Sequence, residues 1–103
     1  MGQLIAGPFC GQLLADVGAE VVKIEPPKTG DSMRQWGRTD AEGRPLWWPV
    51  IARGKKSITL DLRKPEAQDV VRQLAAKTDI LVENFRVGRM EEWGLGYEAL
   101  KAI

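Results

Sequence analysis

Residues 7–27 read GPFCGQLLADVGAEVVKIEPP, and this stretch decides the fold. Apolar residues recur at helical spacing from Phe9 to Val17, after a Gly-Pro pair that suits a first helical turn, so we predict a helix there. Residues 20–25 are a β-branched run that Pro26 stops, which predicts a strand. A helix that leads directly into a strand is typical of α/β proteins.

Helices and strands alternate along the rest of the chain. A long loop is expected at 28–44, further strands at 57–62 and 79–83, and helices at 45–53, 65–77, 87–93 and 97–103. This order predicts a single α/β domain over 1–103, with a mostly parallel sheet in three layers with flanking helices. Few residues precede the first helix, which leaves little room for an earlier strand, so we expect the domain to be truncated.

Composition excludes several classes of protein. The chain has 103 residues, of which 44% are hydrophobic and 28% charged, with a net charge of +1. These values favour an ordinary globular domain, and no apolar run approaches the roughly 18 residues of a spanning helix, so we expect no membrane partner. Residues 1–10 lack the basic residue of a secretory leader, which predicts a cytoplasmic protein.

The chain has one cysteine and no histidine. This excludes a disulfide framework and the nucleophile pairs that use histidine, and it makes a metal site unexpected. Cys10 shares the apolar face of the first predicted helix with Leu13, Leu14 and Val17, so we expect it to be a small buried side chain. No residue is a defensible nucleophile.

A ligand of an open α/β sheet binds beyond the carboxyl ends of its strands. Arg63 and Lys64 stand there, just before the helix that Pro65 opens, and they form a candidate phosphate site. Arg86 adds a guanidinium, and Phe85 offers a ring to stack on a purine. The alternative is that these cations are only solvated and that Phe85 fills a gap under the sheet.

Two other ligand classes have weaker support. Residues 34–64 carry a local charge of +5 with three tryptophans, which suits single-stranded nucleic acid, yet tryptophans beside Leu46 and Val50 are more often core or interface. We therefore expect no nucleic-acid partner. Residues 7–11 lack the spacing of a dinucleotide-binding loop, so that function is only a distant alternative.

The motifs together resemble family III CoA-transferases, the family of formyl-CoA transferase, carnitine CoA-transferase and alpha-methylacyl-CoA racemase. The resemblance spans nearly the whole chain. It is carried by residues 6–27, Gly30-Asp31, Met33-Arg34, residues 53–66, residues 79–88 and residues 94–97.

This resemblance implies a Rossmann-like, N-terminal part of a larger subunit that binds coenzyme A or acyl-CoA. Ile5 and Ala6 are expected along the CoA chain. The adenine, ribose and phosphates are expected at Leu60, Asp61, Leu62 and Arg63, and at Asn84, Phe85 and Arg86. Pro26 stands where relatives often have arginine, and Arg34 or Arg38 is the candidate substitute.

The family transfers CoA between acyl groups and carboxylic acids, and the resemblance places its first strand before Met1 and its catalytic aspartate beyond residue 103. We therefore assign no catalytic residue in this chain, and its own enzymatic activity stays open. The alternative is a non-enzymatic oligomerisation or interaction module derived from such a gene. A truncated sheet exposes apolar surface, which predicts a homo-oligomer, most simply a dimer.

Overall fold

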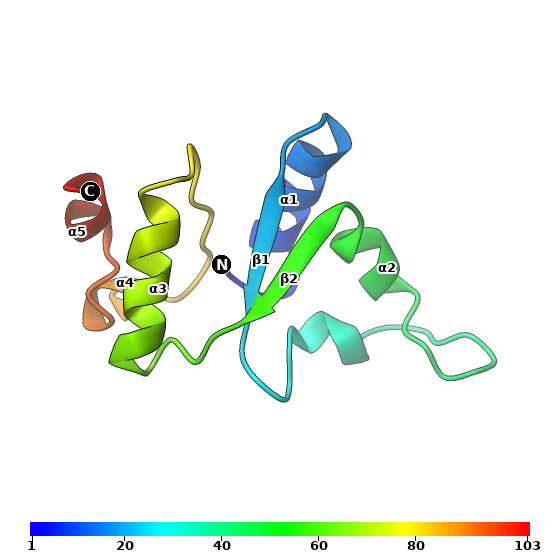
Figure 1. The fold of residues 1–103 in the computed structure, drawn as a ribbon. Helices are drawn as coiled ribbons and strands as arrows, with labels where there is room; N and C mark the ends of the chain where they lie inside the picture. Colours follow the sequence, from blue (N-terminus) through cyan, green and yellow to red (C-terminus); the bar gives the residue numbers. More distant parts are fainter.

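The computed structural model describes residues 1–103 (Figure 1). Apart from the strand expected at 79–83, its elements follow the expected order, with bounds that differ from the expected ones by a few residues. In chain order they are α1 (Ala6–Asp16), β1 (Val21–Glu25), the 3-10 helix η1 (Ser32–Gln35), α2 (Trp47–Ala52), β2 (Lys55–Thr59), α3 (Pro65–Ala75), α4 (Arg89–Glu92) and α5 (Tyr97–Lys101).

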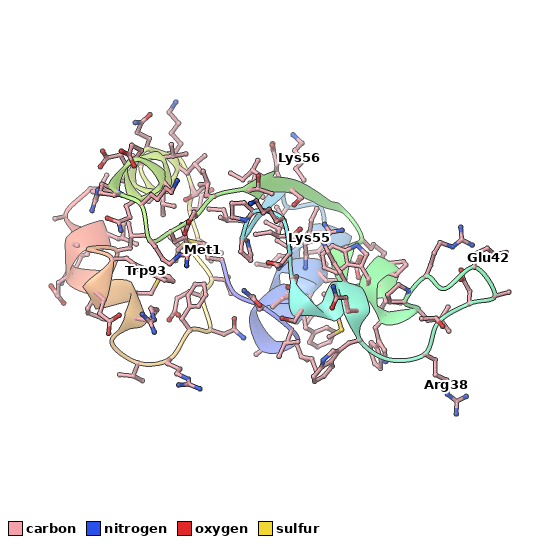
Figure 2. All side chains as sticks on the ribbon, turned by 90° about the horizontal axis from the view of Figure 1, so that it is seen from below. Met1, Arg38, Glu42, Lys55, Lys56 and Trp93 are labelled. Atoms are coloured by element: carbon pink, nitrogen blue, oxygen red, sulfur yellow. The ribbon has the colours of Figure 1, made fainter.

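The sheet consists of two parallel strands, β1 and β2, paired from Val21 opposite Lys55 to Glu25 opposite Thr59. Figure 2 shows α1 and α3 on opposite sides of the strands. A small α/β fold with a parallel sheet and flanking helices is therefore confirmed. The second strand lies earlier than the expected 57–62, although Leu60 N–H still donates to Glu25 O at 2.9 Å.

The predicted strand at 79–83 is wrong. Residues 80–86 form no ladder, and the N-terminal ammonium of Met1 donates to Val82 O at 2.6 Å. This segment crosses the middle of the molecule in Figure 1, beside α3 and apart from β1. The apolar sequence suits a strand, but a strand forms only where a neighbour supplies its hydrogen bonds.

Helix α1 packs through a different face from the one that its apolar pattern indicates. Its buried residues are Gly7, Pro8, Gly11 and Gln12, whereas Cys10 is exposed and Val17 is 83% exposed. A Cβ on Gly11 would lie 3.4 Å from Val21 Cγ1, so glycine permits the close approach of helix and sheet. The expectation that Cys10 is buried is therefore wrong.

The core lies between α3 and the C-terminal segments. Leu62, Val71, Met90 and Leu95 form it, with six half-buried apolar residues packed around them. Only 16 of the 103 residues are buried, so much of the apolar surface stays in contact with solvent. None of the helices combines the length and the apolar character that crossing a membrane requires.

Candidate functional site

The segment that leaves β2 alternates between the core and the surface. Leu62 is buried in the core and Leu60 packs against it. Between and beyond them, Asp61 and Arg63 turn outward and form a bidentate pair, with Nε–Oδ1 and Nη2–Oδ2 distances of 2.8 and 2.9 Å. The hydrogen bond from Arg63 lowers the pKa of the Asp61 carboxyl, so both side chains are charged at neutral pH.

Asn84 connects the segment after residue 83 to the chain before α1. Its side-chain amide donates to Gln3 O and its Oδ1 accepts from Gln3 N–H, both at 3.0 Å. A Cβ on Gly7 would lie 3.0 Å from the same Oδ1, so only glycine fits here without displacing the amide. Asn84 thereby lies close to Ile5 and Ala6, which are exposed at the start of α1.

Phe85 and Arg86 follow with opposite environments. Phe85 is half-buried against the core and meets Trp93 edge-to-face, with ring centroids 5.2 Å apart. Its role in this structure is thus the packing role that the sequence also allowed. Arg86 is exposed, and its guanidinium has no hydrogen-bond or ion-pair partner.

Three of the expected residues pack on one core cluster, and the others lie next to them in the sequence or at the start of α1. Leu60, Leu62 and Phe85 pack on the same cluster, and Asn84, next to Phe85, is hydrogen-bonded to Gln3 ahead of α1. Lys64, at the extended N-cap of the eleven-residue α3, has no ion-pair partner. Arg63, Lys64 and Arg86 are exposed and stand next in sequence to Leu62 and Phe85 of this cluster; these three cations, called the cationic rim below, suit a phosphate group.

A buried polar network at the carboxyl end of β1 was missed by sequence reasoning. Glu25 accepts hydrogen bonds from Arg34, Ser57 and the Asp31 N–H. Burial alone would raise the pKa of Glu25, but these hydrogen bonds outweigh it and lower the pKa to about 2. The carboxylate is charged at neutral pH, and it fastens the loop after β1 to both strands.

Asp31 connects this network to the chain segment before α1. Its Oδ2 lies 2.7 Å from Lys23 Nζ, and its Oδ1 accepts from the N–H groups of Met33 and Leu4 at 2.9 and 3.0 Å. Leu4 has a φ of 63°, a left-handed conformation that is strained for leucine. Asp31 thus holds a strained turn directly before Ile5. The Gly30-Asp31 pair was visible in the sequence, but its loop gave no reason to expect burial.

The two candidate substitutes for an arginine at Pro26 lie in different places. Arg34 is beside the end of β1, where it pairs with Glu25 at 2.8 Å and stacks 4.0 Å above the Trp48 ring. Arg38 extends from the distal loop at the far side of the molecule in Figure 2. Only Arg34 is near the site, and its guanidinium is already used by Glu25.

The structure has no group of three His, Cys, Asp or Glu residues that could hold a metal ion. What the arrangement offers is a rim of cations, a fixed turn before a helix and half-buried apolar side chains. These features suit the binding of an anionic ligand with an organic tail.

Comparison with known proteins decides the family. The model of CoA-transferase family III matches residues 1–103, the full length of the chain. The chain belongs to CoA-transferase family III. The family resemblance read from the sequence is thereby confirmed.

Relatives and solved structures within the family are close in sequence and fold. Succinyl-CoA–D-citramalate CoA-transferase of Chloroflexus aurantiacus is 62% identical over 103 residues, and human succinyl-CoA:glutarate CoA-transferase is 38% identical over 101 residues. A crystal structure of a CAIB/BAIF family protein from Brucella suis superposes with a TM-score of 0.88 at 43% identity, over 99% of this chain and 28% of that one.

The matches cover only part of each relative. The chain aligns over 100% of its length with 26% of the Chloroflexus protein, and over 98% of its length with 23% of the human protein. The chain therefore corresponds to an N-terminal portion, about a quarter of the length of these family III proteins.

Proposed function

We propose that this chain supplies the CoA-binding surface of a family III CoA-transferase, with CoA or acyl-CoA as its ligand. The observation that supports the proposal is the pair of hydrogen bonds between Asn84 and Gln3, directly before the strained Leu4, together with the exposure of Arg63 and Arg86. The proposal takes these three segments, which the family resemblance assigns to CoA, to form one binding surface.

The chemistry of CoA suits this edge. Its phosphates need cations, and Arg86 is available because no carboxylate pairs with it. Arg63 must share its guanidinium with Asp61, so we expect a smaller contribution from it. The pantetheine chain is long and weakly polar, and it fits the exposed start of α1 at Ile5 and Ala6. Catalysis is assigned to parts of the family fold outside this chain.

The proposal is tested by calorimetric titration of CoA into wild type and variants. Arg86→Ala is expected to weaken binding about tenfold, the size of one charge-assisted hydrogen bond. Arg63→Ala should weaken it less. Arg44→Ala is the control matched to Arg63→Ala, because Arg44 is also an exposed arginine paired with carboxylates, but it lies in the distal loop. A loss for Arg44→Ala as large as that for Arg63→Ala or Arg86→Ala, or tighter binding of NAD than of CoA, would refute the proposed site.

A second proposal concerns self-association. Phe9, Leu13 and Val17 are 46%, 49% and 83% exposed along one face of α1, and Val50 of α2 is 44% exposed. Exposed apolar side chains grouped in this way favour burial of this face against another protein surface. We propose that the chain forms a homodimer through this face. Light scattering should give twice the monomer mass, and Leu13→Glu should halve it; a wild-type monomer would contradict the proposal.

We also propose a cytoplasmic location. A lone exposed cysteine without a disulfide partner fits a reducing compartment, where thiols stay free. Fractionation of cells that express a tagged chain should place it with cytosolic markers, and recovery in an oxidising compartment would contradict this.

A further inference from the structure

The peptide group between Gln3 and Leu4 is held at both of its polar atoms. Its carbonyl oxygen accepts from the side-chain amide of Asn84, and its N–H donates to Asp31 Oδ1, both at 3.0 Å. In a trans peptide these two atoms point in opposite directions. Two side chains that are distant from each other in the sequence therefore fix the plane of this one peptide, shortly before α1 begins.

The backbone of Leu4 shows the effect of this restraint. Its φ of 63° lies in the left-handed region, which costs a leucine free energy that the surrounding contacts must supply. Residues held in such conformations cluster at functional sites. Directly after Leu4, Ile5 and Ala6 are exposed, whereas the next two residues of α1 are buried. The strained turn therefore stands where the chain passes from an exposed stretch into the packed part of the helix.

Asp31 is itself held in place from several sides. Its side chain is fully buried, and its own N–H donates to Glu25 Oε2 at 2.7 Å. The oxygen that accepts from Leu4 also accepts from Met33 N–H at 2.9 Å and so caps η1. Lys23 lies 2.7 Å from the other oxygen and neutralises the charge. The Leu4 N–H thus meets an acceptor that cannot follow a change in the turn.

Core packing does not explain the turn. Leu4 is only half-buried and belongs neither to the core around Val71 nor to the apolar residues packed against it. The feature that depends most directly on the turn is the position of the exposed backbone at Ile5 and Ala6. This is the backbone that the proposed function assigns to the pantetheine chain of CoA.

We propose that Asp31 is a positioning residue for CoA, which holds the Leu4 turn and thereby presents the backbone of Ile5 and Ala6 to the pantetheine chain. This inference rests on the proposed function and adds to it a buried residue that does not touch the ligand. A chain that adopts the turn only part of the time binds CoA more weakly in proportion to that fraction. Loss of the Asp31 acceptor should therefore affect binding of the pantetheine part and spare the nucleotide part.

The test compares CoA with adenosine 3′,5′-bisphosphate, which has the nucleotide part of CoA without pantetheine, by calorimetric titration. Both Asp31 variants carry Lys23→Met, so that no unpaired charge is buried. Asp31→Asn keeps an oxygen for the Leu4 N–H, whereas Asp31→Leu has the same branched shape without an acceptor. We expect the leucine variant to bind CoA about tenfold more weakly than the asparagine variant, with equal affinity for the bisphosphate.

Asp40→Leu is the matched control. The Asp40 carboxylate also accepts from two backbone N–H groups, those of Glu42 and Arg44, but it lies in the distal loop. This variant should therefore bind CoA with the affinity of the wild type.

Two variants of Leu4 provide a second arm that leaves Asp31 and Lys23 intact. Leu4→Pro removes the N–H and fixes φ at about −65°, which forbids the turn, so it should weaken CoA binding as Asp31→Leu does. Leu4→Gly permits a positive φ without strain, and adding it to the Asp31→Leu variant should restore part of the lost affinity. Because Leu4 lies outside the core, we expect both substitutions to leave the fold intact.

The outcomes separate this inference from the proposed function. A folded wild type that binds no CoA would contradict both. If the wild type binds CoA, equal CoA affinity of the Asp31→Leu and Asp31→Asn variants would overturn the inference alone. The same holds for equal losses of CoA and bisphosphate binding, which would indicate a purely structural role, and for a Leu4→Pro variant that binds CoA like the wild type.

Discussion

Replacing Asp31 by asparagine isolates the charge in the buried pair that supports the turn before Ile5. Asparagine keeps the size of the side chain and an oxygen for the N–H groups of Leu4 and Met33. It removes the negative charge that lies 2.7 Å from Lys23 Nζ, in a pair whose side chains are 0% and 6% exposed. The remaining Lys23 cation is then buried without an anionic partner, with only the hydrogen bond to Gly2 O.

The expected loss follows from that geometry. Removing one member of a buried pair costs about 3–5 kcal/mol, because the other charge stays desolvated. That is a large part of the roughly 5–15 kcal/mol that stabilises a typical domain. We therefore expect Asp31→Asn to lower the urea midpoint strongly without a large change in the slope of the transition, as followed by tryptophan fluorescence.

Two further variants test whether the loss comes from the unpaired buried charge. Asp40→Asn is the more accessible counterpart, because the Asp40 side chain is 25% exposed and also pairs with a cation and accepts backbone hydrogen bonds, and its effect should be far smaller. The double variant Asp31→Asn with Lys23→Met removes both charges and should be more stable than Asp31→Asn alone. A loss of less than about 1 kcal/mol for Asp31→Asn, the range of exposed pairs, would refute the reasoning.

Three other predictions rest on single features of the structure. Because the pKa of folded Glu25 lies near 2 rather than at its ordinary 4.5, stability should be fully present above pH 4.5 and decline as the pH falls towards 2; Glu25→Gln should flatten this part of the profile, and an unchanged profile would contradict it. Cys10 should react with a thiol reagent in the native chain almost as fast as in urea, and slow labelling would contradict its exposure. Val71→Ala should cost about 2 kcal/mol in urea unfolding and Val70→Ala much less, since Val71 is 1% exposed and Val70 39%; equal losses would disprove the assigned core.

Local signals in the sequence were sufficient for most elements. The β-branched run before Pro26 and the Pro65 helix start gave β1 and α3 nearly at their observed bounds. Both depend on interactions within a few residues, namely strand propensity and helix-start chemistry. The parallel α/β class followed from the order of these elements.

The errors arose where the outcome depends on distant neighbours. Residues 79–83 have strand composition, but no strand lies beside them to complete a ladder. Helix α1 has an apolar face, yet it packs through Gly7 and Gly11, because close approach to the sheet decides which side is buried. Periodicity reports which residues are apolar, not which surface is available to cover them.

In the candidate site, too, the sequence indicated the residues marked by local patterns and not the contacts between distant residues. The cations after β2 and after residue 83 were found from strand-end reasoning, and the family resemblance added Asn84. The burial of Asp31 depends on Lys23 and Leu4, which lie 8 and 27 residues away in the sequence. No local pattern marks such a contact, so the network beneath the site emerged only from the fold.

The measurement that tests the central claim most directly is a calorimetric titration of the chain with CoA and with dephospho-CoA. The structure predicts saturable binding of CoA that weakens when the 3′-phosphate is absent, because the cationic rim at Arg63, Lys64 and Arg86 then loses an anionic partner. A folded sample that binds neither compound, or binds both equally, would contradict the assignment of this edge to CoA.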